Sequence, residues 1–266
     1  MEIKSIGLKS DLMFLEWTSE IKDRGEYLKI ETIDNPKYFW GNLLVFNRPP
    51  QASDFLHWIE IFKTEFSKNP EIEHITFTWD IFGSKPDLSL FLENGFNKEE
   101  VIVLTCSEIK KQFDNNSIQL KKIETNEEWD QVINLQFQTG IETDGYLPEK
   151  YRPFIQQKFE HYKKLIDNGH GEWFGAFQSG VLVSDLGLFG NKEFMRFQSI
   201  ETKTSHRKQG IAQNLIEFAS HQLISENYII QALHDGPAID MYMKIGFNIK
   251  EVLTGVCLYN VKNWKK

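Results

Sequence analysis

The amino-acid sequence predicts an α/β fold composed of two similar domains in tandem, each a mixed, mostly antiparallel sheet flanked by helices. Hydrophobic residues make up 41% of the chain and charged residues 26%, which is typical of a folded globular protein. Helical and strand-like patterns alternate along the second half, as expected for an α/β fold. The third observation is an internal repeat.

Each half of the chain ends in the same arrangement of elements. A helix ends at a Gly-Phe pair, at 95–96 in the first half and at 246–247 in the second. In both halves an apolar strand follows, with a cysteine ten positions after the phenylalanine, Cys106 and Cys257. The matching elements, order and spacing predict a tandem pair of domains.

Composition and the central polar stretch set the domain limits and exclude several classes of partner. The stretch 110–119 lacks hydrophobic periodicity and is the expected linker, which places the domains at 1–112 and 118–266. The net charge of −8 argues against a nucleic-acid partner. No apolar leader and no membrane-length window is present, which predicts a cytoplasmic protein without a membrane partner. The cysteines show no metal-ligand spacing, so no metal site is expected.

The second half is predicted element by element. The helix 126–138 has a broad apolar face, Asn126 as its cap and glutamates in its first turn. A second amphipathic helix, 148–167, begins with proline and is closed by Asn-Gly. The pattern then predicts a three-stranded antiparallel meander, a helix, a short strand, a helix that opens with proline and a final strand or hairpin, at 173–177, 181–189, 194–200, 209–225, 228–233, 237–245 and 247–259.

The turn before the helix 209–225 carries features of a phosphate-binding loop. Small residues, Gly210 and Ala212, allow the backbone to approach a ligand. Free N–H groups at a helix N-terminus carry partial positive charge, and Arg207 and Lys208 add formal charge beside them. A basic, glycine-containing turn is also typical of a solvated loop, so this segment alone leaves both interpretations open.

The residues around this turn resemble a known family. The pattern Arg207-x-x-Gly210-x-Ala212 resembles the Arg/Gln-x-x-Gly-x-Gly/Ala signature of the GCN5-related N-acetyltransferases (GNAT), and 238–247 resembles the A-x-x-x-Y-x-K-x-G-F helix of that family. The resemblance covers about residues 118–260 and implies a tandem-domain GNAT protein. It implies acetyl-CoA as co-substrate, bound by a set of residues on the fourth strand, the loop and the following turn, namely Ile200, Thr202, Arg207, Lys208, Gln209, Gly210, Ile211, Ala212 and Asp235. Asp235 stands where family members usually carry Asn.

The resemblance also implies direct attack of an amine on the acyl group, with Tyr242 as the acid. For the base, Glu201 at the end of the fourth strand is one candidate, and a role in capping the loop below is the alternative. Strict alternation along that strand instead directs Arg196 and Gln198 toward the substrate. A proton relayed by water then replaces a protein base.

The acceptor region is predicted from the loop between the first two helices of this half. Glu142 and Asp144 lie in the loop 140–146, where family members recognise the acceptor, and an ordinary solvated loop is the alternative interpretation. The expected acceptor is a small-molecule or peptide amine, and a monomer or homodimer is expected.

The first half has the elements in the same order but lacks the chemistry. A strand at 40–46 is followed by Pro49 and Pro50, which supply no N–H donors, and then by a helix at 53–66. Phe91 takes the place of Tyr242. We therefore expect the first domain to be a degenerate relative of the second.

Three functions are consistent with these features. The first is an acetyl-CoA-dependent N-acetyltransferase, and the presence of Tyr242 favours it. The alternatives are a non-catalytic acyl-CoA-binding or regulatory module, and a transferase of another acyl group.

Overall fold

A computed structural model describes residues 1–80, 85–110, 117–234 and 236–259. The chain divides into two compact units. The first comprises the described residues of Met1–Val103, Leu233–Asp235 and Glu251–Lys266, and the second those of Leu104–Ala232 and Gly236–Lys250. The expected linker falls largely on 111–116, outside the described residues, so the predicted domain limits stay a prediction.

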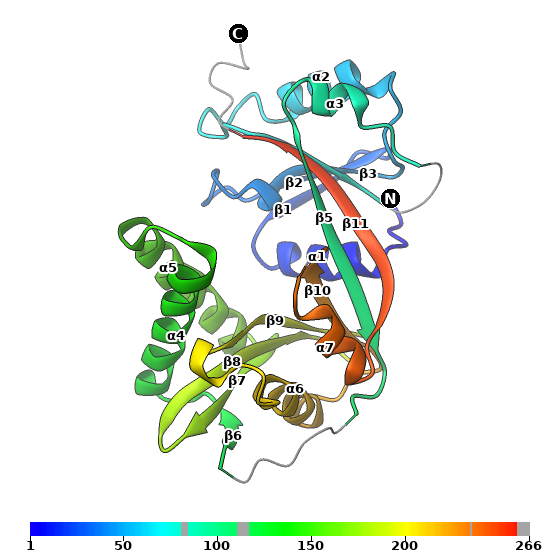
Figure 1. The fold of residues 1–266 in the computed structure, drawn as a ribbon. Helices are drawn as coiled ribbons and strands as arrows, with labels where there is room; N and C mark the ends of the chain where they lie inside the picture. The colour runs from blue at the N-terminus through cyan, green and yellow to red at the C-terminus, as the bar shows by residue number, and fades with distance from the viewer. Residues whose placement is uncertain (81–84, 111–116, 235, 260–266) are drawn as a thin grey trace. The chain divides into compact units, whose positions relative to one another are not determined.

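The first unit combines antiparallel and parallel strand pairs (Figure 1). Strands β1, β2 and β3 are antiparallel neighbours, β3 pairs with β4 in parallel, and β11 pairs with β4 in antiparallel register. The residues that belong to the first unit therefore include most of the chain's last strand. The elements that contribute to it are α1 (Ile6–Glu16), β1 (Glu20–Asp23), β2 (Tyr27–Glu31), η1 (Phe39–Gly41), β3 (Asn42–Phe46), α2 (Asp54–Glu65), β4 (Ile75–Trp79), α3 (Ser89–Glu93), β5 (Asn97–Cys106) and β11 (Asn248–Leu258).

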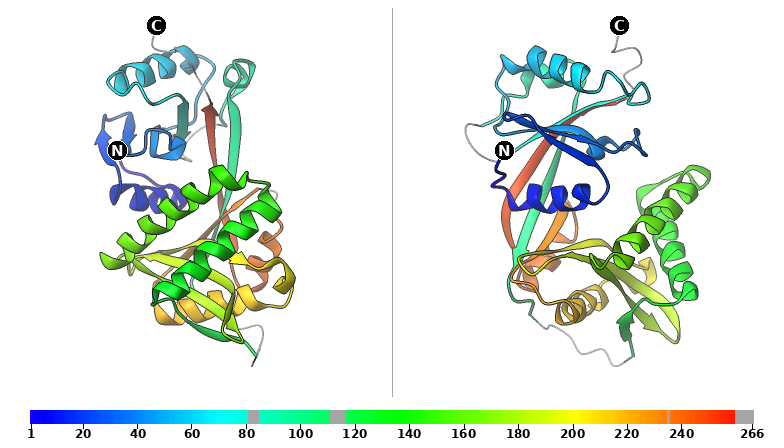
Figure 2. Two further views of the ribbon diagram at one scale, coloured as in Figure 1. Left: turned by 90° about the vertical axis from the view of Figure 1, so that its left-hand side faces the viewer. Right: turned by 180° about the vertical axis from the view of Figure 1, so that it is seen from behind.

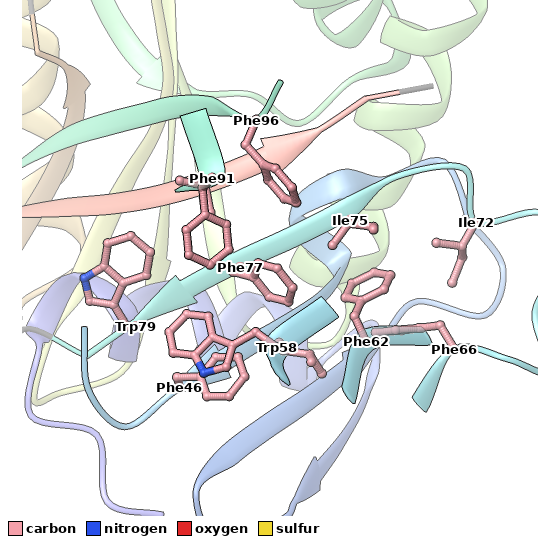
Figure 3. Packing of buried hydrophobic residues seen from close by; sticks show 12 residues of the cluster. Phe46, Trp58, Phe62, Phe66, Ile72, Ile75, Phe77, Trp79, Phe91 and Phe96 are labelled. Carbon is pink, nitrogen blue, oxygen red and sulfur yellow. The ribbon is translucent and has the colours of Figure 1, made fainter. Parts of the chain in front are cut away.

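Aromatic side chains fill the core of the first unit (Figure 3). Phe46 on β3 stacks on Trp58 of α2 with ring centroids 3.6 Å apart and planes 1° from parallel. Phe77 on β4 and Phe91 on α3 meet the same cluster edge-on. All four side chains are at most 4% exposed, so this packing stabilises α2 and α3 against the sheet.

The second unit has a meander with helices on both faces (Figures 1 and 2). Strands β6 to β9 are sequential antiparallel neighbours, and β10 joins β9 in parallel. Helices α4 and α5 pack on one face through contacts of Trp129 and Phe159 with Trp173, and α6 packs on the other through Phe174. The elements are β6 (Gln119–Lys122), α4 (Asn126–Asp144), α5 (Pro148–Asp167), β7 (Gly171–Gln178), β8 (Val181–Gly190), β9 (Met195–Thr202), η2 (Thr204–His206), α6 (Ile211–Gln222), β10 (Tyr228–Leu233) and α7 (Ile239–Lys244).

The predicted α/β class is confirmed, and two details of α4 differ from expectation. The N-cap is Thr125 rather than Asn126, because Thr125 and Glu128 form a reciprocal capping box. The helix also continues through the predicted loop and ends at Gly145, which adopts the left-handed conformation with φ of 70°. Glu142 and Asp144 therefore lie in the last helical turn.

Candidate functional site

The loop before α6 has the backbone geometry of an anion-binding site. Lys208 and Gly210 have φ of 62° and 76°, and α6 begins at Ile211. Among the described residues, no acceptor takes the backbone N–H groups of 208–213, whereas Asn214 N–H already bonds to Gly210 O. Left-handed residues next to a helix N-terminus direct successive N–H groups to one point, which suits a phosphate. A non-glycine residue in this conformation also costs about 1 kcal/mol or more, which is commonest where function requires it.

The side chain of Arg207 links this loop to two other elements. Its Nε donates to Thr202 O at the end of β9 over 3.1 Å, and an Nη donates to Thr143 Oγ1 on α4 over 3.4 Å. The guanidinium also lies 3.8 Å from the carboxylate of Glu201. Its side chain is 36% exposed, so the guanidinium remains accessible to a ligand in solvent.

Strands β9 and β10 separate beside this loop. Their parallel pairing is limited to Met195 with Tyr228 and Arg196 with Ile229, although both strands continue beyond those residues. The facing backbone edges are therefore open to an extended ligand that carries amide groups. Ile200 and Thr202, expected to contact the co-substrate, lie in this separated part of β9.

The corresponding strands of the first unit remain paired to their ends. β3 and β4 pair up to Phe46 and Trp79, and Asp80 N–H continues the pairing to Phe46 O over 2.9 Å. Over the described residues up to Asp80, no opening comparable to that between β9 and β10 is left between β3 and β4.

The loop that follows β3 is also filled by its own side chains. Arg48 forms a two-pronged ion pair with Asp54 at 2.5 and 2.9 Å, and Gln51 N–H donates to the same carboxylate. The Arg48 guanidinium holds the pKa of Asp54 below its usual range, so this carboxylate is charged at neutral pH. An anionic ligand would meet two prolines and a carboxylate at this position, which disfavours its binding.

A bulge in β9 determines which side chains share a face of the sheet. Opposite β8, Glu201 pairs with Asp185 but Gln198 pairs with Gly187, so β9 has one extra residue between them. Ser199 in this bulge has φ of 51°. Because directly opposed residues share a face, Glu201, Gln198 and Arg196 lie on the same face, whereas strict alternation separates Glu201 from the other two.

Glu201 is a partly buried carboxylate surrounded by charged groups. Burial raises its pKa, Arg207 lowers it and Asp144 raises it, with a net increase. Its side chain is 30% exposed. Nearby, Glu142 accepts a hydrogen bond from Thr204 over 2.8 Å, which holds the last turn of α4 beside the end of β9. A carboxyl group with a raised pKa is a better proton acceptor near neutral pH.

Tyr242 lies on α7 and is 7% exposed. Burial raises its pKa, and the negative charge of Glu201 raises it further. Among the described residues, its hydroxyl has no hydrogen-bond partner. The phenol is therefore protonated at neutral pH and is able to donate. The two predicted catalytic residues thus act on each other electrostatically.

The remaining predicted contacts are distributed around the loop. Gln209 donates from Nε2 to Ser205 O over 3.3 Å. Ile211 is 2% exposed, so its backbone N–H rather than its side chain faces a ligand. Ala212 follows in the first turn of α6. Asp235 lies outside the described residues.

Sequence reasoning did not identify Gln136 and Asp185, which hold the bulge. Gln136 Nε2 donates to Asp185 Oδ1 over 2.9 Å and to Ser199 O over 2.8 Å. A carboxylate in the middle of the apolar run 181–189 is the signal that could have drawn attention to Asp185.

A mixed sheet whose central strands separate beside an anion-binding loop defines the second unit as a ligand-binding α/β domain. The family model described as "Acetyltransferase (GNAT) family" matches residues 129–247. This part of the chain therefore matches the GNAT family, which supports an acyl- or acetyltransferase activity. No curated protein matches the sequence significantly.

Solved structures with similar folds include proteins that span nearly the whole chain. A functionally unknown conserved protein from Staphylococcus epidermidis is 13% identical with a TM-score of 0.72, covering 90% of this chain and 93% of its own. A GCN5-related N-acetyltransferase from Kribbella flavida is 14% identical with a TM-score of 0.62, covering 97% of each chain. A tandem GNAT protein from the clavulanic acid biosynthesis pathway is 10% identical with a TM-score of 0.54, covering 91% of this chain and 79% of its own.

At these low identities the likeness is one of fold alone, and it agrees with the predicted fold of GNAT-like domains. In the described ranges, none of the helices is both long enough and apolar enough to span a bilayer. Within the same ranges, no group of three or more His, Cys, Asp or Glu side chains is placed to hold a metal ion.

Proposed function

We propose that this protein is an acetyl-CoA-dependent N-acetyltransferase whose second unit is the active one. The observation that carries the proposal is the meeting of two features within the GNAT domain. The separated part of β9 and β10 lies beside a loop whose N–H groups at 208–213 lack acceptors among the described residues. In the described residues of the first unit, β3, α2 and β4 follow one another in the corresponding order without either feature, which supports activity in the second unit alone.

The residues around the loop suit the charged end of acetyl-CoA. Arg207, Lys208 and the backbone N–H groups of 209–212 would bind its phosphates, because hydrogen bonds between charged groups and backbone donors are strong there. The open edge of β9 near Ile200 and Thr202 would pair with its amide groups. Bound there, acetyl-CoA supplies a thioester that an amine attacks directly.

Glu201 and Tyr242 would carry the proton transfers of this reaction. Glu201 would accept the first proton from the incoming ammonium, either directly or through a water molecule. As the new C–N bond forms and the C–S bond breaks, Tyr242 would donate its proton to the leaving sulfur, and the second proton that the acylated nitrogen must lose would pass through water to restore the phenol. The raised pKa of Glu201 favours the first role, and the raised pKa of Tyr242 keeps its proton available for the second.

The acceptor in this proposal is a small-molecule or peptide amine. Three carboxylates, those of Glu142, Asp144 and Glu201, lie where β9 ends beside the last turn of α4. Their negative charge would attract an ammonium group and raise its local concentration.

Two assays test the proposal in sequence. Thermal shift with acetyl-CoA, free CoA and longer acyl-CoAs measures binding, because a ligand of the folded state raises the melting temperature. Release of free thiol with a panel of amines then measures transfer. If none of these CoA species raised the melting temperature, the proposal would be refuted. Binding without transfer to any amine would favour the non-catalytic module, and a preference for longer acyl groups would favour another acyltransferase.

A further inference from the structure

A buried hydrogen-bond network connects α4 to the bulge in β9. Gln136 on α4 is 4% exposed, and its Nε2 donates to both Asp185 Oδ1 and Ser199 O. Asp185 is fully buried on β8 and also accepts from Trp173 Nε1 over 3.0 Å. The amide nitrogen of Gln136 has two hydrogens, and these two acceptors use both of them.

The backbone carbonyl of the bulge needs a hydrogen-bond donor from outside the strand ladder. The extra residue of a bulge interrupts the ladder between neighbouring strands, so its carbonyl must find another donor if it is buried. Ser199 is also in the left-handed conformation, which is unfavourable for a residue with a side chain. The hydrogen bond from Gln136 satisfies the Ser199 carbonyl and opposes the return of β9 to a regular register.

Asp185 determines which way the Gln136 amide faces. A reversed amide would place its oxygen against Ser199 O and Asp185 Oδ1, both of which are acceptors. The hydrogen bond from Trp173 holds the Asp185 carboxyl in place. Asp185 Oδ2 has no hydrogen-bond partner among the described residues, and burial raises the pKa of this carboxyl. A neutral acid at this position accepts from Gln136 without a buried charge.

We propose that Gln136 and Asp185 are positioning residues, which fix the β9 bulge and thereby set the place of Glu201 for proton transfer. The proposal rests on the proposed function of Glu201. The register shift in β9 puts Glu201 on the face shared with Asp185, next to Arg207 and Asp144. If the strand regained strict alternation, Glu201 would turn to the opposite face, away from these groups.

Leucine substitutions at two glutamines of α4 provide a matched test. Gln136→Leu removes the donor to Ser199, whereas Gln131→Leu removes an acceptor for Leu182 N–H at the start of β8, away from the bulge. We expect Gln136→Leu to lower kcat about 10- to 100-fold while the Kd for acetyl-CoA changes less than about threefold, since small displacements at a reacting group have effects of this size. Gln131→Leu should leave both constants unchanged. A Gln136→Leu enzyme with normal kcat, or an equal loss in both variants, would overturn the proposal.

Two substitutions at Asp185 distinguish a role as a hydrogen-bond acceptor from a role that requires a negative charge. Asp185→Asn keeps an oxygen that accepts from Gln136 and Trp173, so it should retain most of the kcat. Asp185→Val removes the acceptor and should lower kcat as far as Gln136→Leu. If Asp185→Asn were as impaired as Asp185→Val, the orienting role of the neutral acid would be wrong.

Hydrogen exchange tests the network without any enzymatic activity. In Gln136→Leu, the amides of 195–202 should exchange faster than in the unmodified protein, while those of 171–178 stay protected. Unchanged exchange at 195–202 would overturn the proposal that Gln136 fixes the β9 bulge, even if no acceptor amine were known. Faster exchange in a protein that transfers no acetyl group would support this role of Gln136 and would count against the proposed function instead.

Discussion

The buried acid at Asp185 leads to a prediction about stability and pH. Asp185 is fully buried, and burial raises the pKa of its carboxyl well above the usual range. In the unfolded chain this carboxyl ionises with a pKa of about 3.9. Above that pH the folded state holds a proton that the unfolded state has lost, so stability from this group falls as pH rises toward the folded-state pKa. Asp185→Asn removes this dependence.

The size of this pH effect on stability follows from the single proton that Asp185 binds in the folded state and loses in the unfolded state. While Asp185 stays protonated in the folded protein, the variant gains about 1.4 kcal/mol relative to the unmodified protein for each pH unit above about 5. Between about pH 5 and 7 the difference therefore widens by at most about 2.7 kcal/mol. The hydrogen bonds from Gln136 and Trp173 are retained because the Asn oxygen accepts both.

Equilibrium urea unfolding of both proteins at about pH 5, 6 and 7 measures this difference. Other titrating groups are common to the two proteins and cancel when their unfolding free energies are subtracted. Asp130→Asn, at an exposed position on α4, is the matched control for the same Asp-to-Asn replacement outside the buried network. A difference for Asp185→Asn that stays constant with pH would show that Asp185 is ionised in the folded state and would refute the reasoning.

Three further predictions concern the candidate site. Tyr242→Phe should lower kcat about 10²- to 10⁴-fold with an unchanged Kd for acetyl-CoA, because it removes a proton donor without removing a binding contact; steady-state kinetics and calorimetry check this. Arg207→Ala should weaken binding of free CoA by about 1.5–3 kcal/mol in calorimetry, the contribution of a hydrogen bond to a charged group, whereas Arg48→Ala at the corresponding place in the first unit should not change it. For Glu201, kcat/KM should rise with pH through its raised pKa as the carboxyl loses its proton, and Glu201→Gln should remove this rise from the pH–rate profile.

For each of these three predictions, one experimental result would contradict it. Full activity of Tyr242→Phe would exclude the phenol as the acid. Equal losses of CoA binding in Arg207→Ala and Arg48→Ala would mean that both units bind the ligand. An unchanged pH–rate profile in Glu201→Gln would assign the proton transfer to another group or to water alone.

Much of the local structure could be predicted because it depends on short stretches of chain. The proline at 148 and the amphipathic pattern that follows it specify α5 with little help from the rest of the fold. The loop before α6 was predicted from Gly210, whose left-handed conformation the structure shows. The C-terminal end of α4 is not predictable in this way, because Gly140 lies inside the helix and packs against Tyr151 instead of ending the helix.

The sequence by itself determined the order of elements, the tandem repeat and the loop from Arg207 to Ala212, since these rest on local periodicity and on residues close along the chain. Tertiary structure alone decided which side chains meet. The bulge at Ser199 depends on a donor from α4 and on the register with β8, and neither leaves a periodic trace in β9. The separation of β9 from β10 likewise depends on pairing between distant segments. Contacts of this kind exist only once the chain has folded, which is why the face occupied by Glu201 could not be read from alternation.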